Sequence, residues 1–515
     1  MTQERGPAAD YQEAYAVGPA GSSRIEWGRL TCIFLGIALF CAVNFSPPWP
    51  VAVDPQGEII ELSRQGQAAL GLFLLAAVWW VFEVIPIGVT SITIAVVQAM
   101  FLIRPDMIMK DGSIIQGTWI SFTDFLAPSV WFIFGSIMFG LAFSQTGLAK
   151  RMAYRMLCLV GEKTSMIILG VFIMTALLTH IMAHTAVAAA MYPLMIAIYT
   201  LYAGDDRSPT KFGKNMFIGM AYVAGAGSII TLLGAARGAV AIGFFKEIVG
   251  REIGFFELTF YMFPVGWLMV FVLWGFMMLV LKPEKSTISG LKERSKELCM
   301  RLGPMTRTEK LTLVIVMLSI VVMSAKKYIP VLEPVNKSAI ILTATILFFL
   351  FKILTIKDLE EIPWNIILLF GGAMSIGYCL WQTGAAKWMA IQWLAMFENS
   401  PSFLFIMGIS FFVLVMTNLI MNVAAIAISL PVALVIAPYL NVSPEVILFS
   451  SLVVAGMPFL LLVGAAPNAI AYESKQFTSG QFFLYGIPAS LILMLVLALF
   501  VAFIWPAMGM PIHLH

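Results

Sequence analysis

The stretch FGSIMFGLAFSQTGLAKRM at residues 134–152 returns later in the chain as FGGAMSIGYCLWQTGAAKWM at residues 370–389. Both copies begin with Phe-Gly and end with Gln-Thr-Gly, one further residue and Ala-Lys. Two more matches follow in the same order: HTAVAAAMYPLM (184–195) with NVAAIAISLPVA (422–433), and GAARGAVA (234–241) with GAAPNAIA (464–471). The chain therefore contains an internal duplication.

Each copy lies in a very apolar chain. Of the 515 residues, 60% are hydrophobic and 11% are charged, whereas soluble domains have about 45–50% apolar and about 25% charged residues. Apolar runs near the roughly 20 residues that a helix needs to cross a lipid bilayer recur along the chain. The sequence predicts an all-α polytopic membrane protein with about 11 transmembrane segments.

A basic linker divides the chain into two halves. Segment 282–310 carries eight lysines and arginines against four glutamates, so the positive-inside rule predicts that it is cytoplasmic. It separates a first half, residues 27–281, from a second half, residues 311–507. Residues 1–26 are polar and lack the pattern of a signal peptide. We expect a disordered cytoplasmic tail and a multi-pass protein of the inner (cytoplasmic) membrane with its N-terminus in the cytoplasm.

The basic residues also predict how the two copies are oriented. Four of them follow the first Gln-Thr-Gly before residue 164, whereas only Lys387 lies between the second one and Glu398. The first copy should therefore face the cytoplasm and the second the opposite side. Inverted repeats around a site near the bilayer midplane are typical of secondary transporters.

Two apolar runs, 165–201 and 402–440, are too long for one span and have no polar turn in the middle. We interpret each as a re-entrant hairpin whose tip lies within the protein. The runs 215–248 and 446–472 contain glycine-rich interruptions, where a transmembrane helix should unwind and line a cavity. The predicted hairpin tips are Ala183-His184-Thr185 and Met421-Asn422-Val423.

These four stretches, in this order, resemble the divalent anion:sodium symporter family, whose members carry dicarboxylates, tricarboxylates or sulfate. The resemblance covers about residues 65–500. The family pattern has a Ser-Asn-Thr tip in each hairpin and an unwound Gly/Ala-Thr-Pro-Pro-Asn loop in each broken helix. Here the loops read Gly-Ala-Ala-Arg-Gly from Gly234 and Gly-Ala-Ala-Pro-Asn from Gly464. The resemblance also implies alternating access and a homodimer.

Carried over position by position, the resemblance implies a set of site residues. The predicted substrate contacts are His184, Thr185, Asn422, Ala466, Pro467 and Asn468, together with Arg237, which departs from the family pattern and is added because of its charge. The implied remnants of the cation sites are Thr179 and Gly234 in the first repeat, and Thr417, Asn422 and Gly464 in the second. Because the tip serines and both loop threonines are replaced, we expect the first sodium site to be lost and the second to bind Na⁺ only weakly. No other cofactor and no metal is expected.

Arg237 stands where the family has proline. A charged side chain within a membrane costs at least about 2.5 kcal/mol and usually marks a substrate or ion pathway. Our hypothesis is that Arg237 supplies in fixed form the positive charge of a sodium ion and binds a carboxylate or sulfonate through two parallel hydrogen bonds. The alternative is an arginine that extends to the interface or pairs with a structural acid such as Glu83.

His180 lies one helical turn before His184. A zinc pair would make the chain an intramembrane metalloenzyme, but it needs a third ligand that neither hairpin offers. We expect His180 to bond a backbone carbonyl, its repeat mate Asn418 to bond within its own hairpin, and His184 to bind substrate or carry a proton. The five cysteines show no CxxC spacing and imply no disulfide framework or zinc site.

The sequence thus predicts a transporter and not an enzyme. The expected cargo is a small divalent anion, namely a C4-dicarboxylate, sulfate or a sulfonate, and the expected mechanism is sodium-independent exchange or proton coupling. Sodium-coupled symport is the alternative. The net charge of +3 is too small to suggest a nucleic-acid partner.

Overall fold

The computed structural model describes residues 27–514, apart from 54–58, 109–112, 205–207, 327 and 398–400. Regular structure in this part is helical except for two short antiparallel ribbons, which pair β1 (Ala52–Val53) with β2 (Ile59–Ile60) and β3 (Met107–Ile108) with β4 (Ile114–Ile115). Nine helices of the described part are long and apolar enough to cross a membrane. The predicted all-α polytopic fold is confirmed, while the predicted tail at 1–26 lies outside the described residues.

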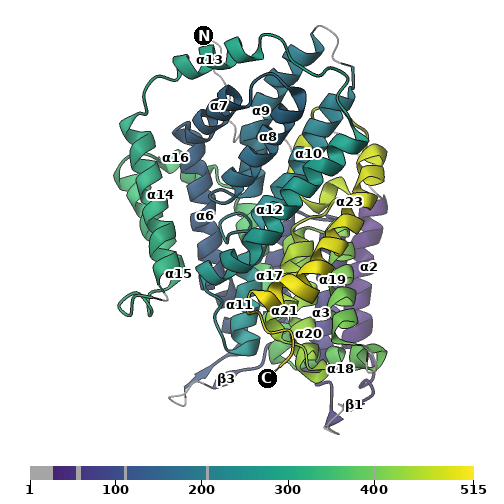
Figure 1. The fold of residues 1–515 in the computed structure, drawn as a ribbon. Coiled ribbons are helices and arrows are strands. Elements are labelled where there is room, and N and C mark those ends of the chain that lie inside the picture. Colours follow the sequence, from purple (N-terminus) through teal and green to yellow (C-terminus); the bar gives the residue numbers. More distant parts are fainter. Residues whose placement is uncertain are drawn as a thin grey trace.

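The helices follow the two halves and the linker (Figure 1). The first half contains α2 (Trp27–Asn44), α3 (Arg64–Val81), α4 (Ile87–Met100), α5 (Gly117–Thr123), η1 (Asp124–Leu126), α6 (Pro128–Gln145), α7 (Leu148–Val160), α8 (Thr164–Thr179), α9 (His184–Ala203), α10 (Lys211–Ser228), α11 (Ala236–Val249) and α12 (Phe255–Val280). The linker contains α13 (Leu291–Arg301). The second half contains α14 (Arg307–Ala325), α15 (Lys337–Leu350), α16 (Ile356–Glu360), α17 (Trp364–Gln382), α18 (Ala385–Phe397), α19 (Ser402–Leu419), α20 (Asn422–Ile436), η2 (Ala437–Leu440), α21 (Pro444–Ala455), η3 (Leu462–Gly464), α22 (Ala466–Tyr472), α23 (Ser479–Leu499), η4 (Phe500–Ile504) and α24 (Trp505–Ala507).

The duplicated Gln-Thr-Gly motif makes the same turn in both halves. It joins α6 to α7 and α17 to α18, and its glycines, Gly147 and Gly384, have φ angles of 77° and 76°. A residue with a Cβ is strained in this left-handed conformation, which favours glycine at both turns. In Figure 1, α7 lies at the upper end of the molecule and α18 at the lower end. The two copies therefore run in opposite directions.

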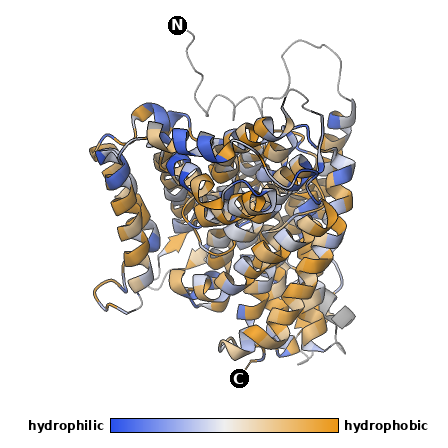
Figure 2. Ribbon diagram, turned by 45° about the horizontal axis from the view of Figure 1, so that its top comes forward, coloured by the Kyte–Doolittle hydropathy of each residue, from blue (hydrophilic) through white to orange (hydrophobic). Residues whose placement is uncertain are grey.

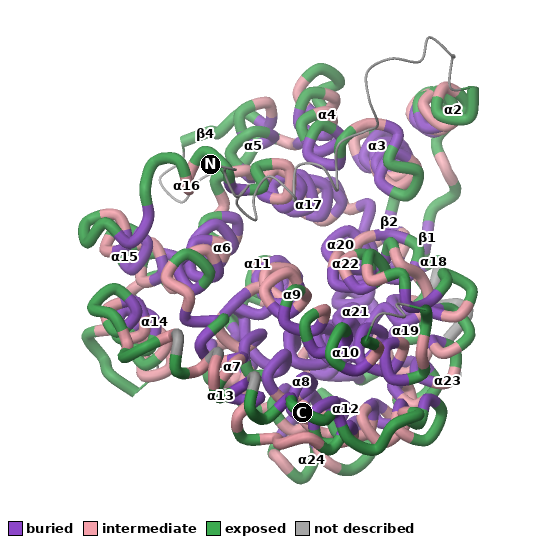
Figure 3. The backbone as a smooth tube through the Cα atoms, turned by 90° about the horizontal axis from the view of Figure 1, so that it is seen from above, coloured by how far each residue is buried: buried purple, intermediate pink, exposed green. Residues whose placement is uncertain are grey.

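Helices of the two halves also pack against each other. Helix α4 of the first half packs along α17 of the second, and α6 packs along α15. Seen from above, α9, α11, α20 and α22 lie toward the middle of the molecule, while α2, α14 and α15 lie at its rim (Figure 3). The central helices are the second limbs of the hairpins and of the broken helices.

Hydrophobic residues cover most of the length of the outer helices (Figure 2). Several large ones on α14 are exposed, among them Val314 and Leu318, each 59% exposed. A soluble protein rarely leaves such continuous apolar surface in water. This surface fits contact with lipid acyl chains.

The two overlong runs are helical hairpins. Helices α8 and α9 are separated only by residues 180–183, and α19 and α20 only by residues 420–421. The predicted tips need a correction, because Thr185 and Val423 lie in the first turn of α9 and α20 instead of in the non-helical tip. His184 and Asn422 are the first residues of these helices, so each stands at a helix N-terminus.

The two glycine-rich runs are interrupted helices. Residues 229–235 separate α10 from α11, and residues 456–465 separate α21 from α22, with the short 3₁₀ turn η3 in the second interruption. We call these segments the first break and the second break. Both lie within the glycine-rich stretches where the sequence predicts unwinding.

Candidate functional site

The first hairpin tip is held to the first break by backbone and side-chain hydrogen bonds. The backbone N–H of His184 donates to the carbonyl of Gly234 at 2.9 Å, and His184 Nδ1 lies 3.3 Å from the same oxygen. The hydroxyl of Thr231 donates to the carbonyl of His180 at 2.8 Å. A Cβ on Gly234 would lie 2.5 Å from the carbonyl oxygen of Thr179, so only glycine allows this approach. The tip and the break therefore form one unit.

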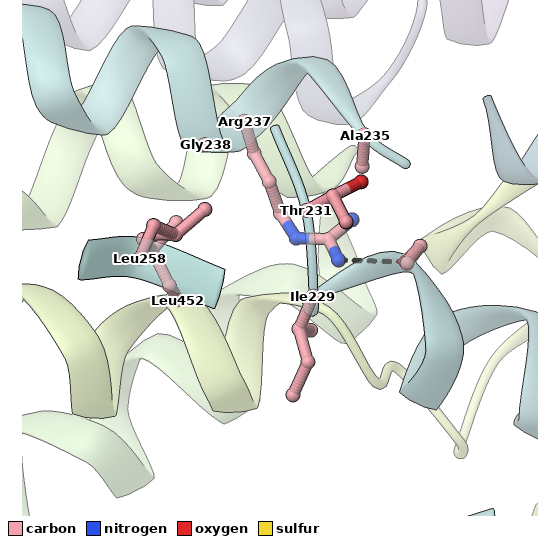
Figure 4. Close-up of a pocket in the computed structure, with 8 residues that line it drawn as sticks. Ile229, Thr231, Ala235, Arg237, Gly238, Leu258 and Leu452 are labelled. Atoms are coloured by element: carbon pink, nitrogen blue, oxygen red, sulfur yellow. Dashed lines mark hydrogen bonds between the residues drawn. The ribbon is translucent and has the colours of Figure 1, made fainter. Parts of the chain in front are cut away.

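Arg237 lies in the first turn of α11, directly after the first break, and is only 1% exposed. Its Nη2 donates to Ser228 Oγ at 2.8 Å, and Ser228 is the last residue of α10. The side chain thus bridges the two halves of the broken helix (Figure 4). Within the described part of the chain, its Nη1 is buried without a hydrogen-bond partner.

The guanidinium of Arg237 also lies against the second break. A Cβ on Gly456 would lie 2.6 Å from Arg237 Nη2 and 3.2 Å from Cζ. Glycine at this position lets the two breaks approach each other. Beside the guanidinium lies a cavity of about 10 Å³, which is the size of one water molecule and too small for a dicarboxylate. The cavity is lined by Ser228, Ile229, Thr231, Ala235, Arg237, Gly238, Leu258 and Leu452.

A second buried arginine, Arg104, differs from Arg237 because it has a carboxylate partner. Arg104 donates to Asp124 Oδ2 at 2.8 Å and to the carbonyl of Ser375 at 3.0 Å. Among the described residues, Arg237 has no such carboxylate partner, and Glu83 is exposed at the surface. Both alternative interpretations of Arg237 are therefore wrong: it does not extend to the interface, and it does not pair with Glu83.

The second break is held by amide side chains. Asn468 Nδ2 donates to the carbonyls of Pro458 at 2.9 Å and Leu461 at 3.1 Å. Asn418 accepts from the backbone N–H of Leu460 at 2.8 Å and donates to the carbonyl of Leu414 in its own helix at 2.7 Å. The predicted bond of Asn418 within its hairpin is confirmed. Neutral hydrogen bonds thus satisfy the freed backbone groups of this break.

The predicted cation-site residues lie beside these breaks. The hydroxyl of Thr179 donates to Ala176 of its own helix at 2.7 Å. The hydroxyl of Thr417 donates to the carbonyl of Ala455 at 3.1 Å, and a Cβ on Gly464 would lie 3.0 Å from the carbonyl oxygen of Thr417. In both repeats a glycine of the break therefore approaches the end of the first hairpin limb.

The two repeats meet through their second limbs. Helix α11, which carries Arg237, packs along α20, which begins at Asn422, and α9 packs along α22. Pro467 and Asn468 are buried in the first turn of α22, and Ala466 is half-buried. Thr185 is half-buried one residue after the start of α9. The structure thus places the predicted substrate contacts at the first turns of four central helices.

His180 does not make the bond expected of it. Both of its ring nitrogens are buried without a hydrogen-bond partner among the described residues, and the ring packs edge-on against Trp267 of α12 at a centroid distance of 5.8 Å. The prediction of a bond from this ring to a backbone carbonyl is wrong, because the neighbouring helix presents an indole there. Within the described residues, no group of three or more His, Cys, Asp and Glu side chains is placed to hold a metal ion.

Ser228, Thr231 and Gly456 also belong to the site but were not singled out from the sequence. Ser228 lies in the AGAGS stretch, which predicts unwinding but not a partner for an arginine nine residues later. Its role depends on the path of the chain through the first break. The repeat comparison gives no signal for Gly456 either, since its importance comes from an arginine in the other half.

Paired hairpins and broken helices in a duplicated architecture are typical of secondary membrane transporters. Residues 39–511 match the family described as "Sodium:sulfate symporter transmembrane region", and the chain belongs to that family. This match bears out the resemblance noted in the sequence.

Two named relatives and one solved structure extend the comparison. The chain is 24% identical to the sodium-dependent dicarboxylate transporter SdcS of Staphylococcus saprophyticus, with 86% of this chain and 87% of that protein covered. It is also 24% identical to SdcS of Staphylococcus aureus strain MRSA252, with 88% and 89% covered. The fold is similar to that of Neisseria gonorrhoeae MtrF, described as illuminating a class of antimetabolite efflux pumps, with a TM-score of 0.54 at 12% identity and 93% and 94% of the chains covered.

Proposed function

We propose that this protein moves small divalent anions, namely C4-dicarboxylates, sulfate or sulfonates, across the cytoplasmic membrane by alternating access. The observation that carries the proposal is the buried guanidinium of Arg237, which lies between the two breaks without a carboxylate partner among the described residues. A fixed positive charge in an apolar protein attracts an anion strongly because the local dielectric constant is low. The names of the family and of the two SdcS relatives support the same class of cargo.

Helix termini add to the positive potential at this place. Helices α9, α11 and α20 begin at His184, Ala236 and Asn422, and each N-terminus is the positive end of its helix dipole. Broken helices of transporters commonly direct such termini at an anionic substrate. The sum of three helix termini and one guanidinium suits a dianion better than a monoanion or a neutral solute.

We further propose that transport occurs by sodium-independent exchange or by proton coupling, with Arg237 in the role that a sodium ion has in sodium-coupled relatives. The loss of oxygen ligands from the first cation site supports this view, because alanines replace its tip serine and its loop threonine and leave Thr179 and Gly234 as the implied remnants. The carbonyl of Gly234 already faces the N–H and the ring of His184. Few oxygen ligands are left for an ion that prefers several of them.

The cavity beside Arg237 holds only one water-sized molecule. Direct contact between a dianion and the guanidinium therefore requires the two breaks to separate. In the conformation described here, Arg237 acts on a bound anion through its charge alone. We propose that separation of the breaks exposes Nη1 during the transport cycle.

Sodium-coupled symport through the second repeat is the second candidate. It is favoured by the oxygens of Thr417 and Asn422, by the close approach of Gly464 to the Thr417 carbonyl, and by the sodium-dependent relatives. For the whole molecule we propose a homodimer with the N-terminus and the basic linker in the cytoplasm. The exposed apolar side chains of α14 support a surface for lipid or for a second copy.

The test of the proposed cargo is counterflow into proteoliposomes. Vesicles with purified protein are loaded with unlabelled succinate, sulfate or a sulfonate and diluted into the labelled anion without sodium. Internal dianion should accelerate uptake, and the rate should saturate with external substrate. Uptake that ignores the internal anion and never saturates would indicate a passive channel and would overturn the proposal.

A further inference from the structure

Two cysteines from distant parts of the sequence meet on the linker side of the molecule. Cys158 near the end of α7 and Cys299 in α13 place their sulfur atoms 2.8 Å apart, although 141 residues separate them in the chain. Each thiol also reaches the opposite helix: Cys158 Sγ lies 3.4 Å from the carbonyl of Ser295, and Cys299 Sγ lies 3.4 Å from that of Tyr154. The two helices thus present their cysteines to each other reciprocally.

Contacts before and after α13 fix its position relative to α7. Before α13, the backbone N–H of Ile288 donates to the carbonyl of Glu162 at 2.9 Å. After α13, Arg151 of α7 donates to Glu309 at 2.8 Å and 2.9 Å and to the carbonyl of Gly303 at 2.8 Å. The linker is therefore held to the α7 region at both ends, and the cysteine pair lies between these two attachments.

We infer that Cys158 and Cys299 form a reversible redox pair whose disulfide fastens the linker helix α13 onto α7. Both side chains are partly exposed, so a small oxidant can reach them. Disulfides in the cytoplasm, where we propose that the linker lies, are usually transient and redox-responsive. The inference concerns the linker and does not rest on the proposed transport function.

The oxidation proceeds by thiol–disulfide exchange with a low-molecular-weight disulfide. One cysteine thiolate attacks a sulfur of the oxidant, forms a mixed disulfide and expels one small thiolate. The other cysteine thiolate then attacks the protein sulfur of the mixed disulfide and expels the second small thiolate. Two electrons pass from the cysteine sulfurs to the oxidant, and the two cysteine protons end on the released thiols.

The rate of this reaction should depend on pH. Burial, together with the contact with Cys299, raises the pKa of Cys158 to about 11. The thiol is therefore protonated at neutral pH, and only a small fraction is the thiolate that attacks a disulfide. Disulfide formation should be slow at neutral pH and should accelerate as the pH rises toward this pKa.

The experiment uses the purified full-length protein and oxidised glutathione as the probe. Treated protein is denatured, its free thiols are labelled with a maleimide mass tag, and unreduced peptides are mapped by mass spectrometry. We expect the number of free thiols to fall from five to three, a cross-linked peptide that joins Cys158 to Cys299, and an upward shift of Tm that a dithiol reductant reverses.

Two serine variants and a matched control separate this pair from the other cysteines. Cys158→Ser and Cys299→Ser should abolish both the cross-link and the Tm shift. Cys41→Ser, in α2, should leave both unchanged. Five free thiols after exhaustive oxidation at raised pH, a cross-link between two molecules, or a Cys158 peptide joined elsewhere would overturn the inference. The outcome is independent of substrate, so it stays distinguishable from a failure of the proposed function.

Discussion

The two breaks have the same backbone plan but are held by different chemistry. At the first break, a guanidinium bridges the two helix halves through Ser228, and a threonine hydroxyl ties the break to the hairpin tip. At the second break, the amides of Asn468 and Asn418 bond backbone groups of the interruption. Only the first break therefore carries a permanent positive charge.

This difference shows that one copy of a duplicated site can acquire a charge while both copies keep the same fold. Freed backbone groups at membrane depth must find partners, and either a cationic or a neutral side chain provides them. The fold therefore does not determine the charge of the site. In this protein the charge was placed in one repeat, which makes the two halves chemically unequal.

Among the substitutions considered, replacement of Arg237 should change anion binding most, because it removes the charge that distinguishes the first break from the second. In Arg237→Met a side chain of similar length remains, but the charge is removed. Since hydrogen bonds to charged groups contribute about 1.5–3 kcal/mol, we expect dianion affinity to fall by roughly ten- to a hundredfold. Titration of purified protein by calorimetry measures this loss.

Arg237→Lys is the matched control, because it keeps the charge but loses the planar pair of donors. It should retain more affinity than Arg237→Met. If Arg237→Met bound the dianion as tightly as the natural protein, the guanidinium would have no part in anion binding. The charge of the first break would then not distinguish its function from that of the second break.

Gly456→Ala tests the contact between the breaks. Its Cβ would lie 2.6 Å from Arg237 Nη2 and 2.3 Å from Ile229 Cγ2, so the guanidinium must move. Overpacking of this kind costs about 1–3 kcal/mol. We expect a lower Tm and weaker anion binding, measured by thermal unfolding with and without dianion. Gly275→Ala in α12 is the control, since nothing lies within 4 Å of its Cβ position.

Asn468→Ala tests the neutral break. The substitution leaves the carbonyls of Pro458 and Leu461 without their amide donor, and loss of partners for buried polar groups costs about 1–3 kcal/mol. Thermal unfolding should show this destabilisation. Ser429→Ala, whose hydroxyl bonds only the carbonyl of Ala425 within α20, should be much milder. Equal Tm values for the two variants would contradict the assigned role of Asn468.

The smallest effect concerns the far end of the charged helix α11. Glu252 pairs with Lys246 of α11 at 3.2 Å and with Lys337 of α15 at 3.0 Å. Burial acts to raise the pKa of Glu252, but the two ammonium groups outweigh it and hold the pKa below its ordinary value. A depressed pKa stabilises the fold above the unfolded value of about 4.3 and loses this contribution as the pH falls through the folded pKa.

The pair is partly exposed, so we expect a contribution of less than about 1 kcal/mol. The Tm difference between the natural protein and Glu252→Gln should be present at pH 6 and should shrink below about pH 4.3, where the carboxylate becomes protonated. A difference that stays constant or grows as the pH falls would show that Glu252 acts in some other way.

Much of the fold could be predicted from the sequence. Hairpins and breaks follow from the length of apolar runs and from glycine clusters, because both reflect local rules for helices in a membrane. The alignment of the two repeats also predicts that His184 and Asn422 lie at corresponding hairpin tips, but not that each begins a helix. These features depend on residues that are close together in the chain.

The partners within the site could not be predicted in this way. The bond of Arg237 to Ser228 depends on how the first break turns, and its approach to Gly456 depends on packing between the halves. His180 packs against Trp267 of α12. The sequence of the hairpin does not predict which residue of α12 faces it. The contact of Cys158 with Cys299 depends on the path of the linker, and no CxxC spacing in the sequence predicts it.

The central claim is that a fixed charge at the first break replaces a coupling ion. The most direct test is the initial rate of dianion exchange by the natural protein in proteoliposomes, measured with sodium and then with choline on both sides at equal ionic strength. We predict the same rate in both solutions. A rate that vanishes in choline and returns in proportion to added sodium would contradict the account.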